Sequence, residues 1–174
     1  LASLRKSLNN ISGGFFPEKK FKVRLVVSRD GSISISFSEI TPLSEGPVKA
    51  AISDKRTDKS DVFLYHKTTE RALYDTEHLR AVNEGLFDLL FLNTDGKVTE
   101  GAITNIMILK DGAYFTPPIS CGVLPGVFRE HLLGSNELPV KEKVLSIEDL
   151  LKADGLFLIN SVRKIVPARL EAVS

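Results

Sequence analysis

The chain has 174 residues, of which 43% are hydrophobic and 26% are charged, an ordinary globular composition that excludes a disordered protein. The formal net charge is +1, and the lysines and arginines are interspersed with acidic residues. This excludes the basic stripe of a nucleic-acid-binding protein, but it leaves room for a site that holds a small anion.

The first residues predict a helix and then a β-hairpin. Leucines at helical spacing indicate a helix over residues 1–10, and because the sequence begins with Leu1 rather than Met, we expect the protein to extend upstream. The stretch FKVRLVVSRDGSISISF, residues 21–37, predicts two strands joined by a turn at residues 29–31.

Residues 41–47 contain two prolines and a glycine, a composition typical of a linker between domains. We therefore predict two domains. Residues 1–41 are the remnant of a small N-terminal α/β domain, and residues 47–174 form a C-terminal domain.

The C-terminal domain opens with a predicted strand, PVKAAIS, and an exposed polar loop over residues 54–61. In the following segment, FLYHKTTER, Thr68 or Thr69 is expected to cap a helix that ends just before Gly85. Lys67 is therefore expected at a strand-to-helix junction.

From Phe87 onward the sequence predicts mostly strands. The strand DLLFL, a turn NTDG, one long apolar strand around VTEGAITNIMIL, a turn KDG and a short strand AYFT form a meander. The loop PPISCGVLPG leads into a helix near Val127, and SIEDLLKA is a second helix with Ser146 and Asp149 at capping-box spacing. The strand GLFLINS then leads into VRKIVPA, so the helices are expected outside a sheet.

Other features narrow the class of protein. Cys121 is the only cysteine, which excludes an intrachain disulfide and a cysteine-based zinc site, and we interpret it as a buried thiol. No apolar run approaches the roughly 20 residues of a membrane span. We therefore expect no metal, no membrane or nucleic-acid partner, and a cytoplasmic location.

Two side chains are candidates for chemistry. Lys67 has apolar neighbours in FLYHKTTER, and an apolar setting lowers the pKa of an amine and makes it nucleophilic near neutral pH. The alternative is a solvent-facing lysine at a strand end. Glu100 has apolar neighbours in its predicted strand, and a buried carboxylate requires a positive or hydrogen-donating partner. The alternative is an edge-strand glutamate that faces outward.

The segment GVLPGVFRE is a third candidate. At a helix start, the backbone N–H groups of Val127 and Phe128 form an anion site, to which the Ser161 hydroxyl adds a donor. Glycine-rich helix entries also occur in proteins that bind nothing, and Ser161 alternatively satisfies a turn. A histidine-based hydrolase is disfavoured, because no serine or cysteine forms a nucleophile motif with His66 or His78.

Taken in order, the segments HKTTER, VTEGAITNI, GVLPGVFR and LINSVRKIVPA resemble the class IV aminotransferases. This family includes branched-chain and D-amino-acid aminotransferases and 4-amino-4-deoxychorismate lyase. Four motifs across residues 66–168 are far more specific than any one of them. The resemblance implies an α/β (α+β) fold of the class IV aminotransferase type, a β-rich pseudo-barrel in the C-terminal domain, and pyridoxal 5′-phosphate as cofactor.

Within the family, FLYHKTTERALYD, TPPISCGVLPGVFR and FLINSVRKIVPARL are most similar to the 4-amino-4-deoxychorismate lyase domain of bifunctional para-aminobenzoate synthases. This similarity implies conversion of aminodeoxychorismate into para-aminobenzoate and pyruvate in folate synthesis. It also implies fusion to, or work with, a chorismate-amidating subunit. Family members are commonly homodimers, so a symmetric dimer is expected by analogy.

The resemblance implies roles for individual residues. Lys67 matches the catalytic lysine that binds the cofactor as an imine, and Glu100 matches the carboxylate that keeps the pyridine nitrogen protonated. Val127 and Phe128 match the positions whose backbone N–H groups hold the cofactor phosphate, and Ser161 matches a hydroxyl that helps them.

Asn105 matches the family's asparagine five residues after the glutamate, where a supporting role is expected. The family usually supplies an arginine to the phosphate from a segment that would lie before Leu1. Candidate cations for a substrate carboxylate are Arg24 and Arg29. Two alternatives stay open, an aminotransferase on the same fold and a non-catalytic interaction domain.

Overall fold

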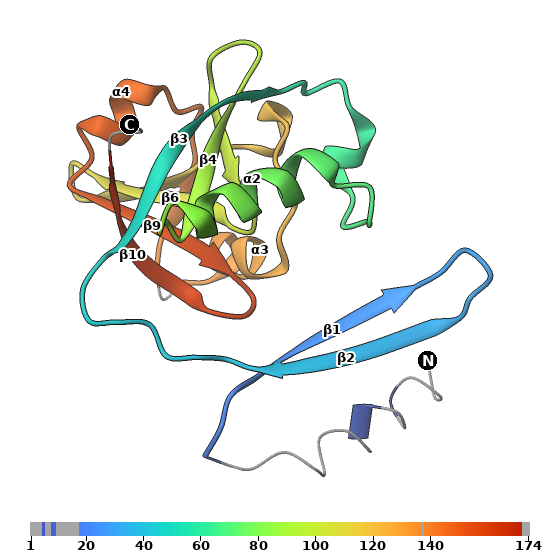
Figure 1. Ribbon diagram of the computed structural model, residues 1–174. Coiled ribbons are helices and arrows are strands. Elements are labelled where there is room, and N and C mark those ends of the chain that lie inside the picture. Colours follow the sequence, from blue (N-terminus) through green and yellow to red (C-terminus); the bar gives the residue numbers. More distant parts are fainter. Residues whose placement is uncertain (1–4, 6–7, 10–17, 137, 172–174) are drawn as a thin grey trace. The chain divides into compact units, whose positions relative to one another are not determined.

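The computed structural model describes Arg5, Leu8, Asn9, residues 18–136 and residues 138–171. The chain forms two compact units, divided between Leu43 and Ser44 (Figure 1). Most of the helix predicted over residues 1–10 lies outside the described residues. The proposed domains, residues 1–41 and residues 47–174, stay predictions.

The first unit contains the predicted hairpin. Strand β1 (Phe21–Val27) pairs antiparallel with β2 (Ile33–Glu39) along its whole length. In the turn, the Asp30 carboxylate accepts a hydrogen bond from Ser32 N, and Gly31 has a φ of 82°. Glycine adopts such an angle without a steric penalty, so the turn falls where the sequence predicted it.

The second unit is built on an eight-stranded mixed sheet in the order β5-β4-β3-β10-β9-β6-β7-β8. Strand β5 also pairs with β6, so the strands from β5 through β3 and β10 to β6 form a closed, barrel-like ring. The pairs β3–β4 and β3–β10 are parallel. The bounds are β3 (Val48–Thr57), β4 (Asp88–Asn93), β5 (Val98–Gly101), β6 (Asn105–Lys110), β7 (Ala113–Thr116), β8 (Val140–Glu142), β9 (Gly155–Asn160) and β10 (Lys164–Leu170).

Alternate residues of these strands build two different layers of core. Leu90 and Leu92 of β4 pack in one cluster with Ile106 and Ile108 of β6 and with Leu158 of β9. Successive side chains of a strand point to opposite faces, so the residues between these face outward, where helices cover them.

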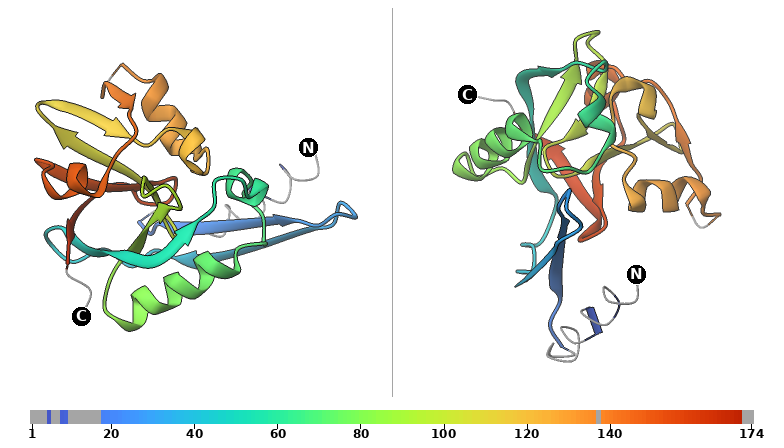
Figure 2. Two further views of the ribbon diagram at one scale, coloured as in Figure 1. Left: turned by 90° about the horizontal axis from the view of Figure 1, so that it is seen from above. Right: turned by 90° about the vertical axis from the view of Figure 1, so that its right-hand side faces the viewer.

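Helices α2 (Ala72–Asn83) and α3 (Val127–Gly134) cover different sides of the ring (Figure 2). Ala81 of α2 packs on Leu89 of β4, and Leu132 of α3 packs with Met107 of β6. A shorter helix, α4 (Ile147–Leu151), begins with the predicted capping box, in which Ser146 and Asp149 bond each other's backbone N–H.

Two predicted elements are wrong in their bounds. The polar segment that was expected to form a loop after PVKAAIS belongs partly to β3, which continues past an irregularity between Ile52 and Arg56. The long apolar strand around VTEGAITNIMIL is in fact two strands, β5 and β6, that meet at a tight turn over residues 101–104. The predicted barrel-like, β-rich character of the C-terminal part is confirmed.

In the described part of the chain, no helix is both long enough and apolar enough to cross a membrane.

Candidate active site

Lys67 lies in the loop between β3 and α2, and it does not directly follow a strand. A 3₁₀ helix, η1 (Val62–Tyr65), intervenes, because the Asp61 carboxylate accepts the N–H of Phe63 and caps it. The predicted strand-to-helix junction is therefore wrong. Lys67 is solvent-exposed in this chain.

The helix after Lys67 starts later than predicted. The Thr68 hydroxyl accepts the N–H of Glu70, so this threonine stabilises a local turn and does not cap α2. The helix begins at Ala72, and its end matches the prediction, with Gly85 at a φ of 70° just after the last turn.

Glu100 is the central buried carboxylate of the second unit. It is the last residue but one of β5, and only 2% of its surface is exposed. Its carboxylate accepts hydrogen bonds from Tyr74 Oη at 3.0 Å, Asn105 Nδ2 at 3.0 Å and Leu124 N at 3.1 Å. These donors satisfy part of the hydrogen-bonding capacity that a buried carboxylate requires.

Burial raises the pKa of the Glu100 carboxyl to about 7. The hydrogen bonds from Leu124 and Tyr74 act in the opposite direction, and so do the positive charges of Arg71 and Lys67. The local arrangement therefore favours either a proton on Glu100 or a further cation beside it. Burial also raises the pKa of the Tyr74 hydroxyl, as does the neighbouring Glu100, so Tyr74 acts as a hydrogen donor at neutral pH.

Asn105 joins Glu100 to the start of α3. The two residues are opposite each other in the pairing of β5 with β6, and Asn105 Nδ2 also donates to Leu124 O at 3.0 Å. Gly126 leaves just enough space for this side chain, because a Cβ at Gly126 would lie 2.1 Å from Asn105 Oδ1. The supporting position expected for Asn105 agrees with these contacts.

Val127 and Phe128 form the first turn of α3, as the sequence predicted. Among the described residues, no side chain caps this helix start, so its first N–H groups are open to an anion. The Lys164 ammonium lies 4.8 Å from the centre of the Phe128 ring. This contact holds the beginning of β10, and with it the turn that contains exposed Ser161, near the start of α3.

The turn at Ser161 is fixed by the residue before it. Asn160 Oδ1 accepts the N–H groups of Val162 and Arg163 at 3.0 and 2.8 Å, while Asn160 Nδ2 donates to Ile103 O at 3.3 Å. The turn after β9 is thereby tied to the turn between β5 and β6. Three of the four predicted segments thus converge at the same end of the ring, and Arg71, the last residue of the fourth segment HKTTER, also bonds the turn between β5 and β6.

Two residues near Glu100, Arg71 and Tyr74, were not identified as candidates from the sequence. Arg71 lies 4.3 Å from the centre of the Tyr74 ring and donates to Ala102 O at 3.0 Å. Both residues lie within the HKTTERALYD stretch at positions that a helical pattern places on one face, but only the fold shows that this face meets β5.

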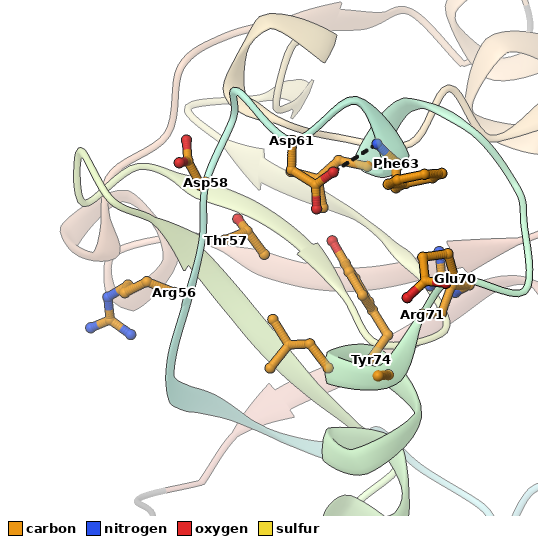
Figure 3. A pocket seen from close by; sticks show the side chains of 11 residues that line it. Arg56, Thr57, Asp58, Asp61, Phe63, Glu70, Arg71 and Tyr74 are labelled. Atoms are coloured by element: carbon orange, nitrogen blue, oxygen red, sulfur yellow. Dashed lines mark hydrogen bonds between the residues drawn. The ribbon is translucent and has the colours of Figure 1, made fainter.

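Beside Tyr74 is a pocket of about 290 Å³ that is bordered by η1 and the first turn of α2 (Figure 3). The pocket is lined by charged residues of both signs: Asp61 directly before η1, and Glu70 and Arg71 in the loop that follows η1. Arg56 points away from the other labelled side chains (Figure 3). Its mixed charge gives this pocket no clear preference for an anion.

Among the residues that the structure describes, the two histidines and the cysteine that were considered from the sequence have no contacts that indicate a catalytic role. His66 is exposed at the end of η1, and His78 is half-buried on α2. Cys121 is buried, as predicted, and its carbonyl accepts a hydrogen bond from Asn93 Nδ2. The described residues contain no group of histidine, cysteine and acidic side chains that could hold a metal ion.

A family model described as amino-transferase class IV matches residues 5–170. The chain therefore belongs to the class IV aminotransferases. This family membership is in agreement with the four sequence motifs and with the barrel-like sheet.

Two curated relatives have different names. A candidate aminodeoxychorismate lyase of Schizosaccharomyces pombe is 30% identical over 155 residues, which are 83% of this chain and 64% of the relative. The branched-chain-amino-acid aminotransferase of Escherichia coli strain K12 is 37% identical over 92 residues, which are 51% of this chain and 30% of the relative. The chain thus spans between about a third and two thirds of the curated relatives it matches.

The similar solved structures also include both proteins named as aminotransferases and proteins named as lyases. A candidate amino-acid aminotransferase from Mesorhizobium loti has a TM-score of 0.80 and 33% identity, and the match covers 87% of this chain and 73% of that one. A candidate 4-amino-4-deoxychorismate lyase from Legionella pneumophila has a TM-score of 0.69 and 25% identity, and the match covers 79% of this chain and 53% of that one. The fold is that of the class IV aminotransferases.

Proposed function

We propose that this chain carries the pyridoxal-phosphate-binding part of a 4-amino-4-deoxychorismate lyase. The observation that carries the proposal is the buried Glu100 carboxylate, whose pKa near 7 favours either a proton on Glu100 or a cation beside it. The choice of a lyase is supported by the strings FLYHKTTERALYD, TPPISCGVLPGVFR and FLINSVRKIVPARL, which are most similar to the lyase domain, and by the S. pombe relative, which matches 83% of the chain.

The residues present fit this cofactor. A protonated pyridine nitrogen beside Glu100 would supply the cation that a buried carboxylate needs. The uncapped start of α3 offers the N–H groups of Val127 and Phe128 to a phosphate, with the Ser161 hydroxyl as a further donor. The positive charge of Lys67 acts to lower the pKa of the Glu100 carboxyl, which supports a role for this lysine at the same site.

When bound, pyridoxal phosphate supplies an electron sink for negative charge at the substrate carbon that carries the nitrogen. The chain's own residues act around that carbon. Lys67 Nζ would hold the cofactor covalently, and its amine would be the base that accepts the proton from this carbon. Glu100 would keep a proton at the pyridine nitrogen, and Tyr74 and Asn105 fix the orientation of Glu100 by their hydrogen bonds.

A lyase catalyses one elimination on one substrate, so its active site has fewer requirements than that of an aminotransferase. Loss of the enolpyruvyl group as pyruvate leaves an aromatic ring, para-aminobenzoate, and aromatisation makes the overall reaction strongly downhill. A transaminase must instead bind two different substrates in turn and complete two half-reactions. An aminotransferase remains the second candidate, because the branched-chain enzymes reach 37% identity over the half of the chain that they match.

The first prediction tests the choice between these reactions. We expect aminodeoxychorismate to give para-aminobenzoate and pyruvate in equal amounts, without added keto acid. Lactate dehydrogenase with NADH measures pyruvate, and the intrinsic fluorescence of para-aminobenzoate measures the other product. Rapid half-transamination of glutamate or D-alanine, with no pyruvate from aminodeoxychorismate, would establish the aminotransferase instead.

We further propose the setting in which this activity operates. The substrate class places the chain in folate synthesis in the cytoplasm, together with a chorismate-amidating synthase subunit that is fused to it or works beside it. A symmetric homodimer is proposed by analogy with the family. Co-purification with a chorismate-amidating subunit tests the partnership, and sedimentation equilibrium tests the dimer.

A further inference from the structure

The turn over residues 101–104 is the point at which the separate parts of the candidate site meet. It follows Glu100 and precedes Asn105, and the hydrogen bond from Gly101 N to Thr104 O, at 2.7 Å, closes it. Arg71 from the segment before α2 binds its Ala102 carbonyl, and Asn160 from the end of β9 binds its Ile103 carbonyl. Any displacement of this turn would therefore move Glu100, Asn105 and the neighbouring segments together.

Beneath this turn lies Asp88, the first residue of β4, which is completely buried. Its Oδ1 accepts the N–H groups of Leu89 and Ala102, both at 2.9 Å. Its Oδ2 accepts the Thr104 hydroxyl at 2.6 Å and Ile103 N at 3.2 Å. Three of these four donors belong to the turn, so the carboxylate binds nearly every hydrogen-donating group that the turn directs toward β4.

The packing around Asp88 leaves no room for a side chain at position 101. A Cβ at Gly101 would lie 2.3 Å from Asp88 Oδ2 and 2.5 Å from Thr104 Oγ1. Glycine is therefore required where the turn crosses the carboxylate, although no unusual backbone angle demands it. Burial of a carboxylate is costly unless it is hydrogen-bonded, and the four donors around Asp88 offset that cost.

We infer that Asp88 is a positioning residue that holds Glu100, together with its partner Asn105, in the orientation that Glu100 needs to contact the pyridine nitrogen. The inference rests on the proposed function, because it concerns the same cofactor site. Asp88 itself does not touch the substrate or the cofactor. It acts through the turn, which begins directly after Glu100, the residue that would contact the cofactor, and ends directly before Asn105, which orients Glu100.

Binding measurements separate this role from a purely structural one. Pyridoxal phosphate is compared with an analogue in which a C–H group replaces the pyridine nitrogen, using calorimetric titration of wild type and the Asp88→Asn variant. We expect Asp88→Asn to weaken binding of pyridoxal phosphate by about tenfold, and to change binding of the analogue by less than about twofold. An equal loss for both compounds, or no loss for either, would overturn the inference.

A matched control is Asp154→Asn. Asp154 also accepts a backbone N–H in a turn between strands, that of Asp111 at 2.9 Å, but this turn lies at the opposite end of β6 from Asn105. The Asp154→Asn variant should leave the affinities for pyridoxal phosphate and for the analogue unchanged. Failure of the wild-type protein to bind either compound would overturn the proposed function and the inference with it, a pattern different from equal losses in the variant alone.

A second variant decides the matter if Asp88→Asn does not fold. Thr104→Val removes one donor to Asp88 and keeps the shape of the side chain, whereas Thr104→Ser keeps the donor. We expect Thr104→Val to weaken binding of pyridoxal phosphate by about threefold, with the analogue unaffected, and Thr104→Ser to bind as wild type does. Equal affinities of Thr104→Val and Thr104→Ser for pyridoxal phosphate would argue against the inference.

Discussion

At the scale of single residues, Lys67 is the residue on which the proposed chemistry depends most directly. Its loop is anchored on one side by η1 and on the other by the turn at Thr68, so its backbone is held although its side chain is exposed. Exposure is compatible with a covalent role, because the amine has to reach a ligand that arrives from solvent.

We expect Lys67→Ala to abolish covalent attachment of pyridoxal phosphate and to lower turnover by about 10²–10⁴-fold, since a positioned base contributes this much. Borohydride reduction followed by peptide mass spectrometry measures attachment at a defined lysine. Lys59→Ala is the control, because Lys59 is a nearby lysine that forms a surface ion pair with Asp95. A reduced adduct on another peptide of wild type would contradict the assignment.

The sequence predicted part of this residue-level picture. The motifs indicated Glu100 and Asn105, and the structure brings both together with Leu124. Asp88 was part of the predicted strand DLLFL, but nothing in that strand indicates that its carboxylate would bind a turn formed by residues 101–104. Such pairings depend on strand register, which a local pattern does not contain.

At the scale of elements, the segment from Leu124 to Val127 connects two ends of the proposed cofactor site. Leu124 bonds the Glu100 carboxylate through its N–H, and α3 begins at Val127. Gly126 lies between them with an ordinary φ of −67°, so its importance comes from space and not from backbone strain.

We expect Gly126→Ala to force apart Asn105 and the start of α3, because the added Cβ would lie 2.1 Å from Asn105 Oδ1. Overpacking of this kind costs about 1–3 kcal/mol of stability, and the affinity for phosphate at the helix start should fall as well. Urea unfolding and titration with pyridoxal phosphate measure the two effects.

The same helix provides a control. A Cβ at Gly134 would meet no atom of another element within 4 Å, and the backbone there has no left-handed angle. Gly134→Ala should therefore be neutral or stabilise the helix by about 0.5–1 kcal/mol. Adding Asn105→Ala to Gly126→Ala should recover part of the lost stability. If the double variant is no more stable than Gly126→Ala, the contact described for Asn105 is not the cause.

Several element predictions were correct because turn and cap signals are local. The hairpin turn, the end of α2 and the capping box of α4 all depend on residues within a few positions of each other. The break between β5 and β6 was missed, because the apolar pattern continues through it and its cause is Asp88, on another strand. The start of α2 was predicted too early for a related reason, since two threonines offered equally good caps.

At the scale of the whole molecule, two buried carboxyl groups make stability depend on pH. Burial raises the pKa of Glu100 to about 7 and that of Asp88 to about 6, from ordinary values of 4.5 and 3.8. The folded chain therefore keeps protons that the unfolded chain has already lost. Their stabilising contribution is complete below about pH 4 and is lost as the pH rises through 6 and 7.

We therefore expect the cofactor-free chain to lose about 2–4 kcal/mol of unfolding free energy between pH 5 and pH 8. Urea unfolding across this range measures the slope. The Glu100→Gln variant should lose less unfolding free energy in the upper part of this pH range. The Glu148→Gln variant, at an exposed residue, should show the same pH dependence as wild type. Bound pyridoxal phosphate should also flatten it, because a cation beside Glu100 lowers the pKa of its carboxyl. A stability that increases from pH 5 to pH 8 would contradict the proposed environment of both groups.

The closed ring of strands has a consequence for how the protein is made. Strand β3 has β4 on one side and β10 on the other, and its Val48 pairs with Ala168, near the end of the described chain. During synthesis, the edge of β3 that pairs with β10 stays unpaired until β10 has left the ribosome. Exposed strand edges are prone to intermolecular pairing. The ring can therefore close only after β10 has been synthesised, and slow closure would leave this edge of β3 open to aggregation.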